Sequence, residues 1–275
     1  MELMQAIILG GIQGLTEFFP VSSSGHLVIC QQMMGLKEPI LLFDISVHVG
    51  TLAAIVIYFF NDIISIFKSL VRSVSFRLRG QGGQFSNAET NDIKMAWLIV
   101  AGSLPTAVIG FGFHMISHVL FSSMIIVGVS LLITGGVLLG TRWINQEKES
   151  GSDLSIKQAL LIGTVQGLAV IPGISRSGAT ISAGLFLGVN RDIAIRYSFL
   201  LSIPAILGAL VLQISTDSSG AGNVSLGIIA TGLVTSLIIG YASLSVLVKM
   251  VQKGHLYFFT PYCVVLGGVV LIAGG

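Results

Sequence analysis

Charged side chains are scarce in this chain of 275 residues: Asp, Glu, Lys and Arg make up 9% of it, while hydrophobic residues make up 53%. Soluble domains carry about 25% charged residues. The 14 basic and 12 acidic side chains cannot cover the water-facing surface of a chain of this length. A soluble fold is therefore excluded, and the composition predicts a polytopic membrane protein.

Three further absences narrow the class of protein. The two cysteines, Cys30 and Cys263, lie in apolar stretches of the sequence and fit neither a disulfide framework nor a zinc site. The net charge of +2 is too small to indicate a nucleic-acid partner, and we expect none. No basic residue precedes the first apolar run in residues 1–5, so we expect no cleavable signal peptide.

The chain instead contains a series of long apolar stretches. A helix that spans the bilayer needs about 20 mostly apolar residues. Six stretches meet this test, with ends uncertain by a few residues: 40–60, 93–116, 118–140, 194–215, 225–248 and 256–274. The sequence thus predicts an all-α integral membrane protein with six transmembrane helices.

Two further apolar stretches, 5–35 and 158–190, are interrupted in the middle. Each interruption, at 19–25 and at 172–178, combines proline, glycine and serine, and such clusters stop a helix and turn the chain. The halves on either side are about 12 to 15 residues long, too short to cross the bilayer alone. We therefore predict two re-entrant helical hairpins, each entering and leaving on one side of the membrane.

Lys and Arg set the orientation through the positive-inside rule. Basic residues cluster in the segments expected as loops at 61–92 and 141–157, whereas the loop at 216–224 has none. With the basic loops in the cytoplasm, the C-terminus lies outside. The first hairpin then dips in from the outside and the second from the cytoplasm.

The two hairpins are copies of one another. Residues 5–25 align without gaps to residues 158–178, with nine of 21 positions identical, which indicates an internal repeat. Each repeat, 1–140 and 141–275, is then a hairpin plus three spans within one membrane domain. Because three crossings are an odd number, the second copy is inverted. Such inverted-topology repeats bring broken helices together near the membrane midplane, where their turns build a site.

The aligned hairpins differ at three chemically important positions. Glu17 aligns with Val170, Ser23 with Arg176 and His26 with Ala179. The repeated residues thus supply the scaffold, and the acid, the hydroxyl, the imidazole and the guanidinium that occur once each are candidates for chemistry. Burying an ionisable group within the hydrocarbon layer of the membrane costs free energy, so such groups are functional by default. Glu17 and Arg176 could also be a structural ion pair that joins the hairpins.

The second hairpin has the composition of an anion site. Arg176 offers five donors in a fixed fork, a geometry that suits phosphate or carboxylate. A turn that leads into a half-helix also points the helix N-terminus at an anion. The alternative is a hairpin tip that merely packs. The other residues expected around the anion, hydroxyls and glycines whose amides can approach it, are Ser175, Ser177, Thr180, Gly173 and Gly178.

The first hairpin suggests an activated nucleophile. Ser23 and His26 are three residues apart, close enough on a helical turn for the imidazole to contact the hydroxyl. Glu17 could orient His26, act as the base or ligate a metal, and Gln13 shares its helix face. Each serine could equally be a helix cap.

A second acid and imidazole follow the first hairpin in the sequence. Asp44 and His48, spaced i, i+4, could line the same cavity in a supporting role. They could equally form an interfacial hydrogen-bonded pair.

Two strings, QGLTEFFPVSSSGH (Gln13 to His26) and PGISRSGATIS (Pro172 to Ser182), resemble the signature motifs of the undecaprenyl-diphosphate phosphatase family, also called bacitracin-resistance proteins. The resemblance runs over nearly the whole chain, including its length, the hairpin placement and the inverted repeat. It implies a membrane phosphatase that removes the terminal phosphate of undecaprenyl diphosphate. This reaction recycles the carrier lipid for peptidoglycan synthesis and confers bacitracin resistance.

The same resemblance implies a location, a cofactor and partners. It implies a multi-pass protein of the bacterial cytoplasmic (inner) membrane whose active site faces the extracytoplasmic side. It also implies dependence on a divalent cation, Mg²⁺ or Ca²⁺, and a homodimer that binds a polyprenyl diphosphate lipid.

The resemblance also implies roles for individual residues. Gln13 and Glu17 fill the family's Glu/Gln-x-x-x-Glu motif, in which Glu17 is also the candidate metal ligand. The serine–histidine turn is matched by Ser22, Ser23, Ser24 and His26. The phosphate-binding motif is matched by Ser175, Arg176, Ser177 and Thr180, with Gly178 inside it.

The residues leave two mechanisms and two functions open. Ser23 could attack the terminal phosphorus while Glu17 or His26 accepts its proton, with Arg176 neutralising the phosphate. Alternatively, Glu17 is a metal ligand and His26 is the base for direct attack by water. Inverted repeats with broken helices are also a transporter architecture, so transport or flipping of a polyprenyl phosphate lipid is the alternative function.

Overall fold

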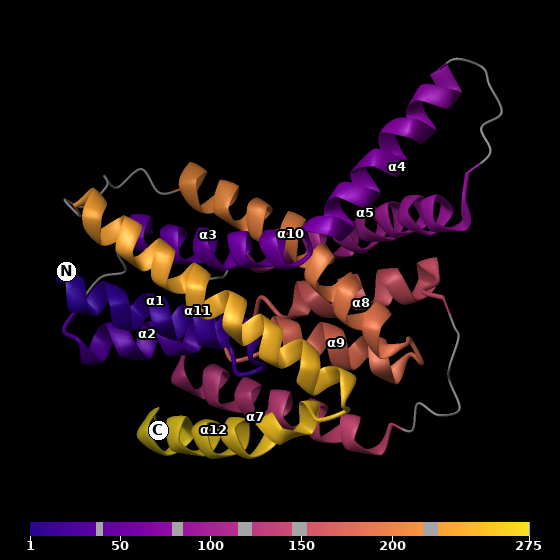
Figure 1. Ribbon diagram of the computed structural model, residues 1–275. Helices are drawn as coiled ribbons and strands as arrows, with labels where there is room; N and C mark the ends of the chain where they lie inside the picture. The colour runs from indigo at the N-terminus through magenta and orange to yellow at the C-terminus, as the bar shows by residue number, and fades with distance from the viewer. Residues whose placement is uncertain (37–40, 79–84, 115–122, 145–152, 217–224, 275) are drawn as a thin grey trace.

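The computed structural model describes residues 1–36, 41–78, 85–114, 123–144, 153–216 and 225–274. Within these residues the chain is helical and has no strand, as expected of an all-α membrane protein. The elements, drawn in Figure 1, are α1 (Leu3–Phe18), α2 (Ser23–Met33), α3 (Leu41–Tyr58), α4 (Phe60–Leu78), α5 (Asn87–His114), α7 (Met124–Gly140), η1 (Thr141–Trp143), α8 (Ile156–Leu168), α9 (Arg176–Phe186), α10 (Arg191–Thr216), α11 (Leu226–Gln252), η3 (Leu256–Phe259) and α12 (Thr260–Gly274).

Both interrupted stretches fold as helix–turn–helix hairpins, as their serine, glycine and proline residues predict. The first hairpin pairs α1 (16 residues) with α2 (11 residues), and the second pairs α8 (13 residues) with α9 (11 residues). At 1.5 Å per residue none of these arms reaches across a hydrocarbon layer of about 30 Å. The side of the membrane from which each hairpin enters stays a prediction.

The expected spans are present with shifted ends. Five helical segments among the described residues are long and apolar enough to cross a membrane: α5, α7 with η1, α10, α11, and η3 with α12. The predicted span at 40–60 corresponds to α3, which forms with α4 a pair bent by 73° that counts as a sixth span if taken together. The predicted loop at 216–224 lies almost entirely outside the described residues.

The segment expected as a loop at 61–92 begins instead with helix α4, so this expectation was wrong. The helix forms because its inner side chains pack against α5 and the core. Arg196 of α10 also lies 2.6 Å from Asp62 of α4 and 3.2 Å from Asp92 of α5. Helix α5 starts earlier than expected, because Ser86 and Glu89 form a reciprocal cap at its first turn.

The two halves of the chain exchange helix contacts. Helix α1 packs along α11 of the second half, and α8 packs along α5 of the first half (Figure 1). At the aligned positions Gly10 and Gly163, the backbones approach Gly232 and Gly102, respectively. Small residues allow such close approach between membrane helices. This reciprocal packing is what a two-fold arrangement of inverted repeats requires, although the repeat boundaries at residues 140 and 141 stay predictions.

We expect Gly163→Ala to destabilise the protein by about 1–3 kcal/mol, because a Cβ at this position would overlap the backbone of Gly102. The measurement is the thermal unfolding midpoint of the purified protein in detergent. Gly112→Ala is the matched control, since nothing lies within 4 Å of a Cβ there. An equal or higher midpoint for Gly163→Ala would contradict the close contact between α8 and α5.

Candidate active site

The tips of the two hairpins touch each other. The hydroxyl of Ser22 in the first tip accepts a hydrogen bond from the Gly173 amide of the second tip at 3.1 Å. In return, the Ser177 hydroxyl donates to the Phe18 carbonyl at 2.8 Å. These two bonds join turns that are about 150 residues apart in sequence. The repeat therefore places both motifs at one junction, as the sequence predicts.

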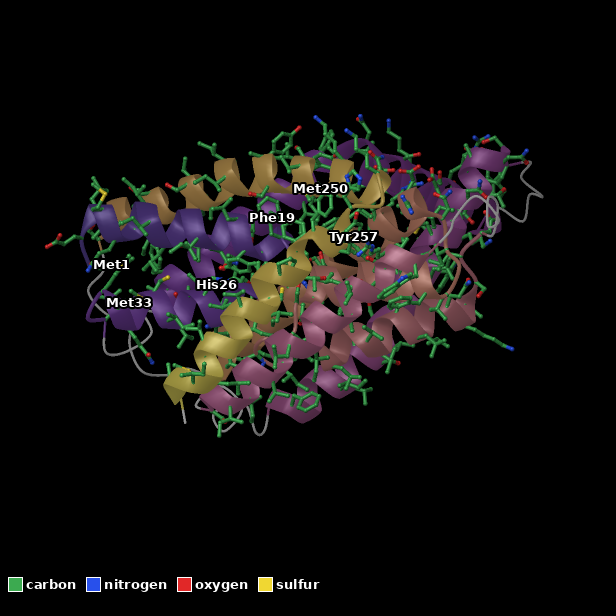
Figure 2. The ribbon with its side chains drawn as sticks, turned by 90° about the horizontal axis from the view of Figure 1, so that it is seen from below. Met1, Phe19, His26, Met33, Met250 and Tyr257 are labelled. Atoms are coloured by element: carbon green, nitrogen blue, oxygen red, sulfur yellow. The ribbon has the colours of Figure 1, made fainter. Side chains whose placement is uncertain are left out.

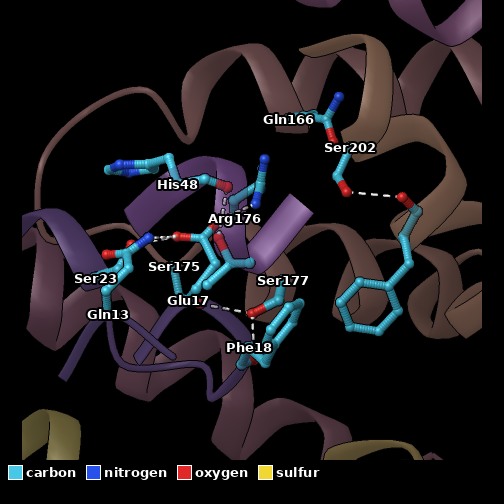
Figure 3. A network of polar contacts seen from close by, with 12 residues as sticks. Gln13, Glu17, Phe18, Ser23, His48, Gln166, Ser175, Arg176, Ser177 and Ser202 are labelled. Carbon is cyan, nitrogen blue, oxygen red and sulfur yellow. Dashed lines mark hydrogen bonds and ion pairs between the residues drawn. The ribbon is translucent and has the colours of Figure 1, made fainter. Parts of the chain in front are cut away.

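Glu17 is the centre of this junction (Figure 3). Its Oε1 atom forms an ion pair with the Arg176 guanidinium, which joins the two hairpins. Its Oε2 atom accepts from the Ser23 hydroxyl at 2.7 Å and from the Gln13 amide at 3.0 Å. The side chain of Glu17 is 7% exposed and that of Arg176 is 23% exposed. A buried carboxylate is stable here because three donors, one of them charged, satisfy its oxygens.

The expected phosphate-binding residues of the second hairpin gather at the start of α9, directly beside Arg176. Their side-chain groups already have partners within the chain. The Ser175 hydroxyl caps α9 by accepting from the Gly178 amide at 3.2 Å and lies 3.2 Å from the Ser177 hydroxyl. Thr180 donates to the Arg176 carbonyl at 2.9 Å. These residues therefore shape the turn, and their contact with phosphate stays a prediction.

The remaining serine of the first tip is also part of the junction. The Ser24 hydroxyl lies 3.4 Å from the Ser22 hydroxyl. It therefore lies beside the contact that Ser22 makes with the second tip. Its expected role in binding phosphate stays a prediction.

The expected contact between His26 and Ser23 is replaced by other bonds. The Nδ1 atom of His26 lies 2.8 Å from the Ser22 carbonyl oxygen, and its Nε2 atom lies 2.6 Å from the hydroxyl of Tyr262. The Ser23 hydroxyl points to Glu17 instead. The three-residue spacing gave the wrong partner, because both side chains bond to groups outside their own turn of α2, and Ser22, which precedes this helix, has a positive φ of +69°.

Asp44 and His48 are not joined through their side chains. The Asp44 carboxylate accepts from the Gln31 amide at 2.7 Å, which fixes α3 to the second arm of the first hairpin. The His48 ring is bonded to the Asp44 backbone carbonyl at 2.8 Å. His48 nonetheless lies beside the junction in Figure 3.

Two contributors to the site were missed by the sequence reasoning: Gln31 and Tyr262. Gln31 is buried, 6% exposed. It follows the apolar residues 27–30 of the predicted hairpin, and a polar residue within a predicted membrane segment is a signal that could have been used. Tyr262 lies 236 residues from His26. No local pattern links the two positions.

The described residues contain no group of three or more His, Cys, Asp or Glu side chains that could hold a metal ion. Among the residues that the structure describes, Glu17 is the carboxylate that bonds to both hairpins at the junction of the tips. Beside it, the Gln13 side-chain oxygen is buried without a hydrogen-bond partner in the described part of the chain. Carboxylate and amide oxygens suit Mg²⁺ and Ca²⁺, and Mg²⁺ is often held by one or two carboxylates together with substrate phosphates. The donors therefore fit a cation that is completed by a phosphate ligand.

Comparison with known proteins agrees with the motifs. The family model described as "Bacitracin resistance protein BacA" matches residues 6–269. A protein of Desulfatibacillum aliphaticivorans is 47% identical over 274 residues, which cover 99% of each chain. A protein of Desulfosudis oleivorans is 47% identical over 278 residues, which cover 100% of this chain and 99% of that one. Both relatives are named undecaprenyl-diphosphatase.

Proposed function

Since the chain belongs to the bacitracin resistance protein BacA family, we propose that it hydrolyses undecaprenyl diphosphate to undecaprenyl phosphate and inorganic phosphate. This reaction recycles the carrier lipid for cell-wall synthesis and confers resistance to bacitracin. One observation carries the assignment of the site: the Ser23 hydroxyl donates to Glu17 at 2.7 Å, and the same carboxylate pairs with Arg176. A nucleophile, a proton acceptor and a phosphate-binding cation are thus adjacent.

The first step is attack by the Ser23 oxygen on the terminal phosphorus. The Ser23 proton passes to Glu17, to which it is already hydrogen-bonded. A bond forms between the serine oxygen and the phosphorus, and the bond from that phosphorus to the bridging oxygen breaks, so undecaprenyl phosphate leaves. Arg176 stabilises the charge on the transferring phosphoryl group.

The second step frees the enzyme. Water attacks the phosphorus of the phosphoserine, and the bond between that phosphorus and the Ser23 oxygen breaks. Glu17 returns its proton to the Ser23 oxygen, and inorganic phosphate leaves with both hydrogens of the water. The competing mechanism, in which His26 activates water, has less support from the geometry. The two ring nitrogens of His26 are engaged by the Ser22 carbonyl and the Tyr262 hydroxyl. We therefore favour Ser23 as the nucleophile.

We propose that Glu17 and Gln13 hold a divalent cation, Mg²⁺ or Ca²⁺, together with phosphate oxygens. The cation would neutralise charge on the diphosphate. EDTA is expected to lower phosphate release at least about tenfold, and added Mg²⁺ or Ca²⁺ to restore it. Gln13→Ala should raise the half-saturating metal concentration about tenfold, because one oxygen ligand is lost.

The control for the metal prediction is Gln166→Ala. Gln166 is the aligned residue of the second hairpin and is buried like Gln13, with its oxygen also unpaired in the described structure. It lacks a carboxylate one turn later, since Val170 stands where Glu17 stands in the first hairpin. Full activity in EDTA, or equal metal dependence for both variants, would count against this metal site.

We further propose that this multi-pass protein lies in the bacterial cytoplasmic membrane as a homodimer, with its active site open to the extracytoplasmic side. Basic residues support this orientation. Lys94, two residues after the predicted cytoplasmic segment 61–92, pairs with Asp153 of the predicted cytoplasmic segment 141–157 at 3.0 Å, so the end of the first segment lies near the second. Cysteine labelling from each side of sealed vesicles tests the orientation, and light scattering in detergent tests the dimer.

The reciprocal packing of the two broken-helix hairpins favours a second candidate, transport of a polyprenyl phosphate lipid. The deciding experiment measures inorganic phosphate released from a C15 or C55 isoprenyl diphosphate by purified protein in detergent. Transport needs two compartments, and hydrolysis does not. Release by the wild type supports the phosphatase. No release from folded, metal-supplied protein would reject it and favour transport.

A further inference from the structure

Ser22 and Ser175, the residues directly before the second helix of each hairpin, differ in backbone conformation, although they are aligned in the repeat. Ser175 has an ordinary extended backbone (φ −78°, ψ 119°), and its hydroxyl caps its own helix. Ser22 has φ +69° and is the only non-glycine residue with positive φ in the described part of the chain. Its hydroxyl accepts from Gly173 of the other hairpin instead. Such a conformation is strained, and it persists where surrounding groups hold it.

His26 is one of the groups that hold Ser22. In the second hairpin the Ser175 carbonyl accepts from the backbone amide of Ala179 at 2.8 Å. At the aligned place in the first hairpin, the His26 imidazole contacts the Ser22 carbonyl, also at 2.8 Å. A carbonyl oxygen only accepts, so Nδ1 carries the proton and donates. The His26 side chain thus supplies to Ser22 a bond that the backbone supplies in the other repeat.

Tyr262 of α12 fixes the His26 ring. With the proton on Nδ1, Nε2 of the neutral imidazole is an acceptor, and the Tyr262 hydroxyl donates to it at 2.6 Å. The two rings are nearly parallel, at 14°, with centroids 5.8 Å apart. The neighbouring Cys263, fully buried, contacts the Pro20 carbonyl at 3.3 Å. Helix α12, at the yellow end of the colour scale, runs past His26 in Figure 2, and its adjacent residues Tyr262 and Cys263 both contact the first hairpin.

We propose that Tyr262 and His26 are positioning residues for the phosphatase reaction: they hold Ser22 in its left-handed conformation and thereby aim the Ser23 hydroxyl. This inference rests on the proposed function. Ser23 directly follows Ser22 and is the first residue of α2, so the backbone angles of Ser22 set the direction of its side chain. That direction brings the hydroxyl within 2.7 Å of Glu17. His26 exchanges no proton with the substrate in this arrangement.

The test compares His26→Asn with His26→Ala. Asparagine keeps an N–H donor near the position of Nδ1 but does not titrate, whereas alanine removes the donor. We expect kcat to fall at least about 100-fold in His26→Ala and to stay within about tenfold of wild type in His26→Asn. The acidic limb of the kcat/KM profile against pH should be unchanged in His26→Asn. Equal inactivity of the two variants would overturn the proposal and make His26 a proton acceptor.

A second comparison tests Tyr262 itself. We expect Tyr262→Phe to lower kcat about tenfold with KM nearly unchanged, and to cause no further loss in a His26→Ala background. The matched control is Tyr241→Phe, whose ring lies 5.8 Å from that of Tyr58 where α11 packs against α3. Its kcat should equal that of the wild type. Unchanged kcat in Tyr262→Phe, or additive losses in the double variant, would overturn the proposal.

The activity of the wild type distinguishes failure of the proposed phosphatase function from failure of the positioning role. If purified wild-type protein releases no phosphate, the proposed phosphatase function fails. If it releases phosphate while His26→Asn and His26→Ala are equally inactive, the function stands and only the positioning role fails.

Discussion

Ser23→Ala is expected to release inorganic phosphate at least about 1,000-fold more slowly than the wild type, because no other group replaces the lost nucleophile. The structure makes Ser23 the candidate through its position. It is half-buried at the first residue of α2, and its hydroxyl donates to the Glu17 carboxylate at 2.7 Å. The loss should appear in kcat, while KM changes little, because the hydroxyl acts in the transition state.

Rapid acid quench of the wild type with labelled substrate should trap a phosphoserine at Ser23. The matched control is Ser245→Ala. Ser245 is a serine of α11 outside the site, and its hydroxyl donates to the Tyr241 carbonyl of its own helix at 2.8 Å. It should keep activity within about tenfold of the wild type and retain the trapped intermediate. Unchanged turnover in Ser23→Ala would exclude a phosphoserine intermediate and favour direct attack by water.

The hairpins and their meeting point follow from local features of the sequence. Pro20 and Pro172 lie in clusters of serine and glycine that stop the helices, and the aligned residues of the two tips reveal the repeat. The ion pair between Glu17 and Arg176 follows in turn, since inverted repeats bring their broken helices together. These features could be predicted because each depends on a short, strong pattern.

The fine geometry of the site could not be predicted, because it depends on contacts between distant segments. Tyr262 reaches His26 from the last helix, and the chain offers no local pattern that links them. The positive φ of Ser22 is also hidden, because serine gives no signal for a left-handed conformation as glycine does. Sequence spacing therefore suggested a contact between His26 and Ser23, whereas the tertiary structure placed each against another partner.

Helix α4 could not be predicted from the sequence for a different reason. The charges between residues 61 and 92 favoured a loop, yet Ser65 and Arg196 both bind the Asp92 carboxylate and draw this segment into the bundle. The interpretation of charge as exposure failed for Asp62 and Asp92, which pair with Arg196 of α10. Lys68 and Arg72 are exposed, although they lie on a helix rather than in a loop.

Arg176→Ala is expected to lower kcat/KM at least about 100-fold, which corresponds to about 3 kcal/mol of transition-state stabilisation. It also leaves Glu17 buried without its cationic partner, so it should destabilise the fold by about 3–5 kcal/mol. Both effects follow from one ion pair that joins the hairpins. The measurements are phosphate release and the thermal unfolding midpoint in detergent.

Arg176→Lys separates the catalytic role of this ion pair from its structural role. Lysine restores a positive charge beside Glu17 but not the planar fork that binds phosphate through two parallel hydrogen bonds. If Arg176 binds the transferring phosphoryl group, this variant should recover most of the thermal stability and remain at least about tenfold less active than the wild type. Recovery of both stability and activity would make the pair a structural clamp between the hairpins, and phosphate binding would then fall to the amides of the α9 turn and the cation.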